Sequence, residues 1–160
     1  MKKLLCLSLI AVCTFLQTSF AQCLEGNCYE GRGTYLYPSG AKYKGQFRKG
    51  KIHGQGTLYF SNGNKYVGKW VDHYRHGQGR LVFTNGDQYD GQFYRSKFHG
   101  QGVMAFANGD RYRGNWTDDY MHGDGTYAYH NGDRYEGQFR KGKLHGQGTM
   151  YYADGDRFTG

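Results

Sequence analysis

Proline and the branched aliphatic residues are what this sequence most lacks. Its 160 residues include one proline, and leucine, isoleucine and valine are scarce beyond residue 20. Glycine is abundant, with 27 residues, a composition typical of collagen or of disordered chains. Collagen is excluded because the glycines follow no three-residue period, and disorder is excluded because 18% of the residues are aromatic. The composition therefore predicts a β structure interrupted by glycine, in which aromatic rings supply the apolar surface.

Long apolar runs are also missing, except at the N-terminus. Met1-Lys2-Lys3 is basic, residues 4–16 are apolar, and Ser19-Phe20-Ala21 has small residues where signal peptidase reads them. This pattern predicts a secretory signal peptide over residues 1–21, cleaved after Ala21. A membrane anchor is the alternative, but the run is shorter than the roughly 20 residues that span a bilayer. We therefore expect an exported protein of the periplasm, the cell envelope or the medium.

Cysteine is rare, and cleavage of the signal would leave only Cys23 and Cys28 of the four cysteines. Because exported proteins can hold disulfides, this pair is predicted to close a small ring in an N-terminal cap and half-repeat over residues 22–42. Lipidation of Cys23 is the alternative, although Gln22 is larger than the residue that lipoprotein signals place there. The mature chain would keep 19 basic and 13 acidic residues, a formal charge of +6.

A period of 23 residues runs through the rest of the chain without an insertion. Each unit carries a tyrosine, a glycine two positions later, a second aromatic, a His-Gly pair and a turn glycine. The tyrosine recurs at Tyr43, Tyr66, Tyr89, Tyr112 and Tyr135. The second aromatic recurs at Phe47, Trp70, Phe93, Trp116 and Phe139. Five full units in register predict a repeat array over residues 43–160, which ends with the start of a sixth unit.

Each unit has the pattern of a β-hairpin. Residues 56–60 and 65–70 are strand candidates on either side of Asn62-Gly63, a pair that favours a type I′ turn because both central residues there need positive φ. The segment 71–76 is then expected to connect one hairpin to the next. A lone hairpin is marginal in water, so we expect stacked hairpins to bury one another's aromatic faces.

One face of the predicted sheet carries the recurring aromatic residues. Tyr66, Gly68 and Trp70 share this face by the two-residue alternation, and Gly68 leaves room for a ring on the backbone. Tyrosine and tryptophan are frequent binding anchors, so the face is a candidate partner surface. The alternative is that the rings form the core between repeats. The candidate surface comprises Tyr43, Phe47, Tyr66, Trp70, Tyr89, Phe93, Tyr112, Trp116, Tyr135 and Phe139.

These residues resemble the MORN repeat family, whose units begin with Tyr-x-Gly and carry an aromatic and a His-Gly-x-Gly element at this period. The match is Tyr43-Lys44-Gly45-Gln46-Phe47 followed by His53-Gly54-Gln55-Gly56, and it covers about residues 29–160. The resemblance implies an all-β fold: an elongated, single-layer antiparallel sheet of stacked 23-residue hairpins. It also implies a role in protein association or membrane attachment. With its leader, the chain is similar to a bacterial-type exported member.

The recurring histidines do not predict a metal site or catalysis. They share one repeat position and would lie about 10 Å apart, whereas zinc ligands lie about 2 Å from one ion. We expect them instead to fix the connections by hydrogen bonds. The aspartates that follow the turn glycines also share one position, with too few ligands per repeat for calcium. The sequence therefore predicts no enzyme, no metal and no cofactor. The histidines are His53, His76, His99, His122 and His145.

The basic excess gathers in alternate connections, whose formal charges run +3, −1, +2, −2 and +3. Neighbouring connections of opposite sign, about 10 Å apart, would attract one another weakly, since that is about one Debye length. An anionic membrane surface is a candidate partner, although the alternation breaks the continuous basic stripe that stable membrane docking needs. Export argues against nucleic acid. The basic loop residues are Arg48, Lys49, Lys51, Arg95, Lys97, Arg140, Lys141 and Lys143.

Together these features favour a non-catalytic exported scaffold that associates with a protein or with the cell envelope. A membrane-lipid-binding module, or the non-catalytic N-terminal part of a longer envelope enzyme, is the alternative. The segment that ends at Gly160 is expected to leave an unprotected strand edge unless the array continues, and such an edge favours edge-to-edge self-association.

Overall fold

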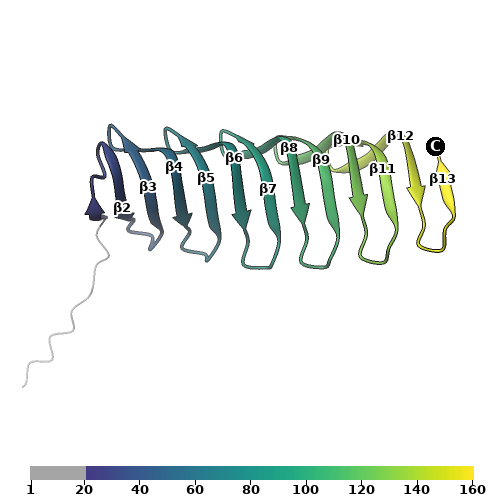
Figure 1. Ribbon diagram of the computed structural model, residues 1–160, viewed down its shortest axis with the longest axis horizontal. Coiled ribbons are helices and arrows are strands. Elements are labelled where there is room, and N and C mark those ends of the chain that lie inside the picture. The colour runs from purple at the N-terminus through teal and green to yellow at the C-terminus, as the bar shows by residue number, and fades with distance from the viewer. Residues whose placement is uncertain (1–20) are drawn as a thin grey trace, which may run out of the picture.

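The computed structural model describes residues 21–160, which form one antiparallel sheet of 13 strands in sequence order. Figure 1 shows the hairpins following one another along a single long axis, in one layer. The predicted all-β, single-layer array of hairpin repeats is therefore confirmed. The strands are β1 (Gln22–Gly26), β2 (Gly31–Leu36), β3 (Lys42–Arg48), β4 (Lys51–Tyr59), β5 (Lys65–Val71), β6 (Tyr74–Val82), β7 (Gln88–Tyr94), β8 (Lys97–Ala105), β9 (Arg111–Thr117), β10 (Tyr120–Ala128), β11 (Arg134–Arg140), β12 (Lys143–Tyr151) and β13 (Arg157–Thr159).

The predicted signal peptide falls almost wholly on residues 1–20, which lie outside the described residues. Within residues 21–160, no helix is long and apolar enough to cross a bilayer.

Two kinds of turn join the strands, one at each edge of the sheet. At the Asn62-Gly63 edge only Gly63 has positive φ, 87°, and its N–H donates to the Phe60 carbonyl, which is the geometry of a three-residue loop. At the opposite edge Asp72 and His73 both have positive φ, 45° and 71°. The type I′ geometry predicted for Asn-Gly thus belongs to the other edge.

The positive φ values of Asp72 and His73 also correct the predicted connection over residues 71–76. Asp72 and His73 form a tight two-residue turn, and β6 starts directly after it at Tyr74. Aspartate and histidine are among the residues that tolerate positive φ, so this turn needs no glycine to mark it. From β2 to β13, each strand is therefore paired with the next through a short turn.

Each long even-numbered strand bends at its His-Gly pair. In β4 the register with β3 shifts next to Gln46, and Gly54 has a φ of 62°. The Gln46 side-chain oxygen accepts a hydrogen bond from the Gln55 N–H at 2.6 Å. The register shift is a β-bulge, in which one strand has an extra residue, and a bulge bends its strand. Positive φ recurs at Gly77, Gly100, Gly123 and Gly146, so the His-Gly element marks a bend in every repeat.

A row of glycines crosses the sheet at right angles to the strands, and the tyrosines lie against it. A Cβ added at Gly68 would lie 2.5 Å from the Tyr66 hydroxyl oxygen and 2.6 Å from the Gly79 Cα. The Tyr66 hydroxyl donates to the Lys69 carbonyl at 3.0 Å. The space predicted at Gly68 is thus filled by the ring of Tyr66 itself. The glycine row comprises Gly26, Gly33, Gly45, Gly56, Gly68, Gly79, Gly91, Gly102, Gly114, Gly125, Gly137 and Gly148.

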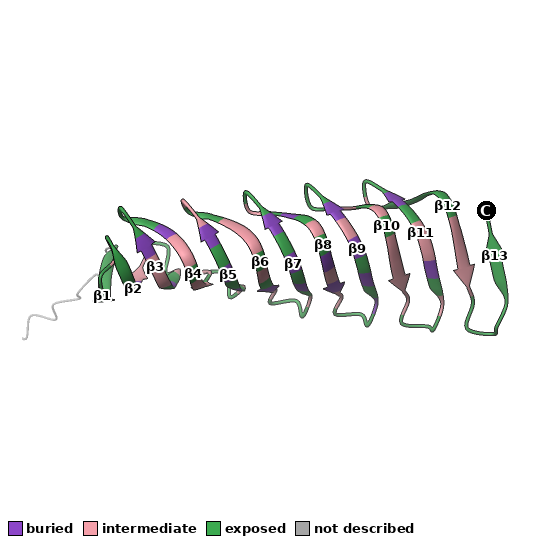
Figure 2. Cartoon of the chain, turned by 45° about the horizontal axis from the view of Figure 1, so that its top comes forward, coloured by how far each residue is buried: buried purple, intermediate pink, exposed green. Residues whose placement is uncertain are grey.

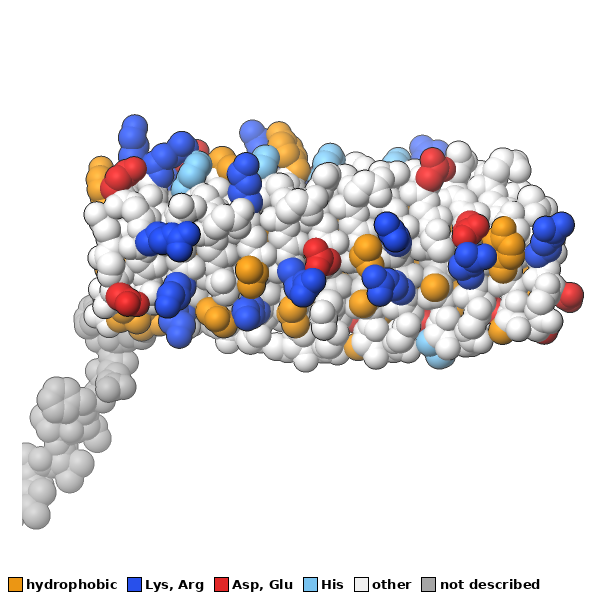
Figure 3. Space-filling model, in the orientation of Figure 1, with side chains coloured by type: hydrophobic (Ala, Val, Ile, Leu, Met, Phe, Trp, Pro, Cys, Tyr) orange, Lys and Arg blue, Asp and Glu red, His pale blue; other side chains and the backbone are white. Residues whose placement is uncertain are grey.

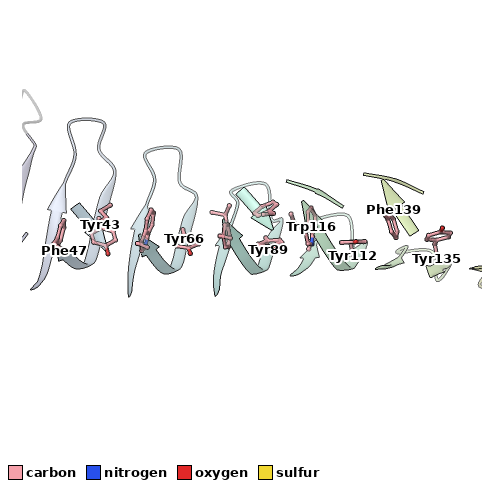
Figure 4. Close-up of a cluster of buried hydrophobic side chains, with 14 residues drawn as sticks. Tyr43, Phe47, Tyr66, Tyr89, Tyr112, Trp116, Tyr135 and Phe139 are labelled. Carbon is pink, nitrogen blue, oxygen red and sulfur yellow. The ribbon is translucent and has the colours of Figure 1, made fainter. Parts of the chain in front are cut away.

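The aromatic residues form one continuous core on this side of the sheet, which we call the inner face. The Tyr66 ring meets Trp70 of its own repeat at 4.9 Å and Phe93 of the next repeat at 5.0 Å, both edge to face. Such pairs add about 0.5–1.5 kcal/mol each beyond simple burial. Figure 4 shows the rings recurring from hairpin to hairpin, and Figure 2 shows the buried bands that they make on the odd-numbered strands.

Candidate functional site: a groove on the outer face

The ten aromatic residues considered as a partner surface lie in this core. Their exposed fractions run from 0% at Tyr43, Tyr66, Tyr89 and Tyr112 to 7% at Tyr135. The bent strands and the neighbouring rings cover both sides of each ring, so these residues do not line an open groove. A surface for a partner has to be sought on the other side of the sheet.

The outer face is formed by the alternate residues of the same strands. On β5, Lys65, Val67 and Lys69 are exposed while Tyr66 and Trp70 are buried. The repeats differ at one position of this face in particular. The position of Val67 is occupied in the five full units by Lys44, Val67, Asp90, Arg113 and Glu136.

A series of hollows lies along the glycine row on the outer face. One is lined by Arg32, Lys44, Thr57 and Val67, among others, and encloses about 410 Å³. The next shares Val67, extends to Arg80 and encloses about 660 Å³. A further hollow of about 450 Å³ lies over β8–β11. We call this recess the glycine groove, and its floor is the backbone of the glycine row, since a Cβ on these glycines would point to the inner face.

Unpaired cations line the first half of the groove or lie on the same strands beside it. Arg32, Lys42, Lys44, Lys65 and Lys69 lie on the outer faces of β2, β3 and β5, and we call them the basic cluster. None of the five forms an ion pair with any residue from 21 to 160. Figure 3 shows Lys and Arg side chains spread over this face among smaller hydrophobic ones.

An exposed aromatic ring lies within the basic cluster. The ammonium groups of Lys42 and Lys65 lie 5.5 Å and 5.4 Å from the centre of the Tyr59 ring, which is 42% exposed. Both distances allow cation–π attraction. The ring therefore holds two positive charges close together at the side of the groove.

Farther along the sheet the outer face carries acidic side chains as well. Arg80 pairs with Asp90, and Arg134 pairs with Glu136 at 2.7 Å. These are exposed pairs, worth about 1 kcal/mol or less in stability, but they neutralise the local charge. The hollow over β8–β11 is lined by Arg113, Asp124 and Glu136, so positive charge does not dominate there.

The predicted basic loops lie along the edge opposite the Asn-Gly turns. Arg48 pairs with Asp72 of the next loop at 3.5 Å, and Lys97 pairs with Asp118 at 3.1 Å. Attraction between neighbouring loops of opposite sign is therefore confirmed for these two pairs. Six cations of this edge are exposed and make no ion pair within residues 21–160: Lys49, Lys51, Arg95, Arg140, Lys141 and Lys143.

Three of the recurring histidines lie against neighbouring side chains. The rings of His76 and His99 lie 5.3 Å and 5.7 Å from the Tyr94 ring, one on each side of it. The buried Nδ1 of His53 makes no hydrogen bond and lies 3.6 Å from the Asp72 carboxylate. His53 therefore lacks the hydrogen bond that was predicted for these side chains. In the described part of the chain, no three histidine, cysteine or acidic residues are grouped as metal ligands.

The aspartates after the turn glycines tie neighbouring repeats together. The Asp87 carboxylate accepts the Ala107 N–H of the next turn at 2.8 Å, and Asp133 does the same for Ala153 at 2.9 Å. Asp110 accepts from both the backbone N–H and the ring of His130, and these bonds hold the pKa of its carboxyl far below the usual range. These bonds agree with the turn chemistry predicted for this position.

Cys23 and Cys28 form a disulfide at the N-terminal edge. The bond fastens β1, a strand of five exposed residues that pairs with β2 along one side only.

The outer-face groove was missed by sequence reasoning, which considered the aromatic face and the loops. One signal was available in the 23-residue alignment. The residue just before the core tyrosine is basic in all units except the third, at Lys42, Lys65, Arg111, Arg134 and Arg157. Because the core tyrosine points inward, its neighbour has to point outward, so this column predicts cations on the outer face.

Fold and groove together define an open β-repeat scaffold. The family model for the MORN repeat matches residues 29–42, 43–65, 66–88, 89–111, 112–134 and 135–157. The chain belongs to the MORN repeat family, whose repeats indicate a non-catalytic scaffold. No curated protein matches it.

Two solved structures show a similar but distant arrangement. One is the TCP domain of SAS-4 (dCPAP) of Drosophila melanogaster, in complex with a proline-rich motif of Ana2 (dSTIL). It is 15% identical with a TM-score of 0.45, covering 99% of this chain and 97% of that one. Another is the wild-type TCP10 domain of Danio rerio CPAP, in complex with a peptide of Danio rerio STIL. It is 11% identical with a TM-score of 0.37, covering 88% of this chain and 67% of that one.

Proposed function

We propose that this chain is an exported, non-catalytic scaffold whose glycine groove binds an extended segment of a protein partner. The proposal rests on the contrast between the two faces of the sheet. The inner face is closed by its own aromatic core, whereas the outer face is recessed along the glycine row and differs from repeat to repeat. Concave surfaces with a few polar groups and some apolar contact are typical of binding sites.

Export is supported by two features of the N-terminal region. The basic start, apolar run and small residues before residue 22 fit a cleaved leader, and the Cys23–Cys28 disulfide fits an oxidising compartment. Mass spectrometry of the protein from its own host tests the proposal. We expect a mature chain that begins at Gln22 with both cysteines oxidised. An unprocessed chain with reduced cysteines, or a lipid on Cys23, contradicts it.

Groove binding is tested with displayed random peptides of about 12 residues, long enough to cross six strand spacings of about 4.8 Å. Peptides selected on the full chain are measured again on Val67→Trp, which places a large ring where two hollows meet. Ser61→Trp, at an exposed turn, is the control of equal size. We expect Val67→Trp to weaken binding by about tenfold or more, a change of about 1.4 kcal/mol, with no effect of Ser61→Trp. Equal binding to both variants rules the groove out.

An anionic membrane surface is the second candidate, favoured by the six exposed loop cations without ion pairs. Co-sedimentation with anionic vesicles at low and high salt tests it. This function is supported if binding disappears at high salt and in a variant that combines Lys49→Gln, Lys51→Gln, Lys141→Gln and Lys143→Gln. No sedimentation at low salt removes it.

A further inference from the structure

The basic cluster is the feature of the groove that points to a particular kind of ligand. We infer that the first half of the glycine groove, over β1–β7, takes an acidic, extended polypeptide segment. The inference rests on the proposed function and adds to it the charge and the position of the bound segment.

The two halves of the outer face differ in charge. Away from the loop edge, β1–β7 carry six basic side chains on this face and two acidic ones, Glu25 and Asp90, and Asp90 is already paired with Arg80. Five cations are left without an ion pair in a region of four adjacent strands, β2–β5. Fixed like charges around a recess with low-dielectric walls concentrate counter-ions there. An acidic segment is therefore the ligand that this half attracts.

The spacing of the cations suits an extended chain that runs along the groove. Lys42 is the register neighbour of Tyr59, and Tyr59 is the neighbour of Lys65, so the two lysines lie two strand spacings apart, about 10 Å. A chain in the polyproline II conformation, which is common in unfolded segments, brings every third residue to one side at intervals of about 9 Å. Acidic residues three apart would thus meet successive lysines.

The shape of the surface favours a polypeptide over a bilayer. The cations flank a recess whose floor is the glycine backbone, with Val67 and Tyr59 exposed beside it. A flat lipid surface reaches the lysine side chains but leaves the recess empty. A single extended chain fills the recess, places apolar side chains against Val67 and brings its carboxylates to the cluster.

The repeats supply a matched pair of variants. Lys42→Glu with Lys44→Glu changes two members of the basic cluster. Arg111→Glu with Arg113→Glu makes the same charge change at the same two positions three repeats later, outside the cluster. All four side chains are exposed, so neither double variant is expected to disturb folding.

The experiment sequences the displayed peptides that the full chain enriches and measures the tightest of them by fluorescence anisotropy at low and high salt. We expect an excess of Asp and Glu in peptides that Val67→Trp fails to bind. We expect affinity to fall about tenfold or more in K42E/K44E, to change less than about twofold in R111E/R113E, and to weaken in high salt.

Each other outcome has a separate meaning. Groove-dependent peptides without an acidic excess overturn this inference and leave the proposed function standing. An absence of groove-dependent peptides overturns both. Binding to phosphatidylglycerol vesicles is the third outcome. If that binding is lost in K42E/K44E and is not displaced by acidic peptides, the inference is overturned in favour of a lipid surface.

Discussion

The inner and outer faces of the sheet are built from alternate residues of the same strands, yet they tolerate change very differently. The inner position holds tyrosine in all five full repeats, with each ring pressed against two glycines. The adjacent outer position holds Lys44, Val67, Asp90, Arg113 or Glu136. A ring packed on backbone leaves no spare volume, whereas an exposed side chain makes few contacts that fix its identity. The inner face thus specifies the array, and the outer face can vary with the ligand.

The largest expected effect is a loss of the folded sheet at alkaline pH. Burial raises the pKa of Tyr43, Tyr66 and Tyr89 well above the usual value of 10, and that of Tyr112 to about 12. These tyrosines contribute their full stability below pH 10 and lose it as pH rises from 10 through the folded-state values. Melting temperatures measured from pH 8 to pH 12 should fall steeply above pH 10. A flat profile would mean that the rings are not buried.

The next largest effect is a difference in stability between variants of two neighbouring residues of β5 that lie on opposite faces. Gly68→Ala adds a Cβ against the Tyr66 hydroxyl and the Gly79 backbone, so we expect a loss of about 3 kcal/mol in the free energy of unfolding. Val67→Ala, on the exposed face, should cost about 0.5 kcal/mol. Urea denaturation measures both. Similar losses for the two variants would contradict the division between the faces.

A smaller effect is expected when only the tyrosine hydroxyl is removed. Tyr66→Phe keeps the ring on the glycines but deletes the hydrogen bond to the Lys69 carbonyl. We expect a loss of about 1 kcal/mol, together with a shallower decline in stability above pH 10. An unchanged alkaline decline would show that Tyr66 does not contribute to it.

The smallest effect on stability is expected on the outer face. K42E/K44E should change the free energy of unfolding by less than about 0.5 kcal/mol, because both side chains are exposed and neither forms an ion pair. The same variant should have the largest effect on ligand binding. A loss of several kcal/mol in thermal or urea unfolding would show that the cluster serves the fold.

Much of the fold followed from one property of the sequence, its 23-residue period. The period, the two-residue alternation around Tyr66 and the scarcity of other apolar residues were enough to predict the strands and the stacked hairpins. The turn at Asp72-His73 was missed because positive φ at such residues is set by the strands on either side of it. Asn62-Gly63 was recognised as a turn, but its type depends on how many residues lie between the paired strands, which periodicity does not specify.

The groove could not be derived in the same way. It depends on the bend at each His-Gly pair and on the alignment of glycines from 12 strands into one row. Neither is local: the bend appears only when Gln46 is paired in register with His53, and the row appears only when all the registers are known. The column of cations headed by Lys42 was readable from the sequence, but its relation to a recess was not.

The most direct test of the account is an amide chemical-shift map of the ¹⁵N-labelled chain with the tightest selected peptide added. If the outer groove is the binding site, the largest shifts will fall on groove residues of β3–β5, such as Gly45, Gly56 and Val67. The loop tips at Lys49 and Lys141 will stay unchanged. Shifts confined to the loop edge, with the groove amides unmoved, would contradict the account.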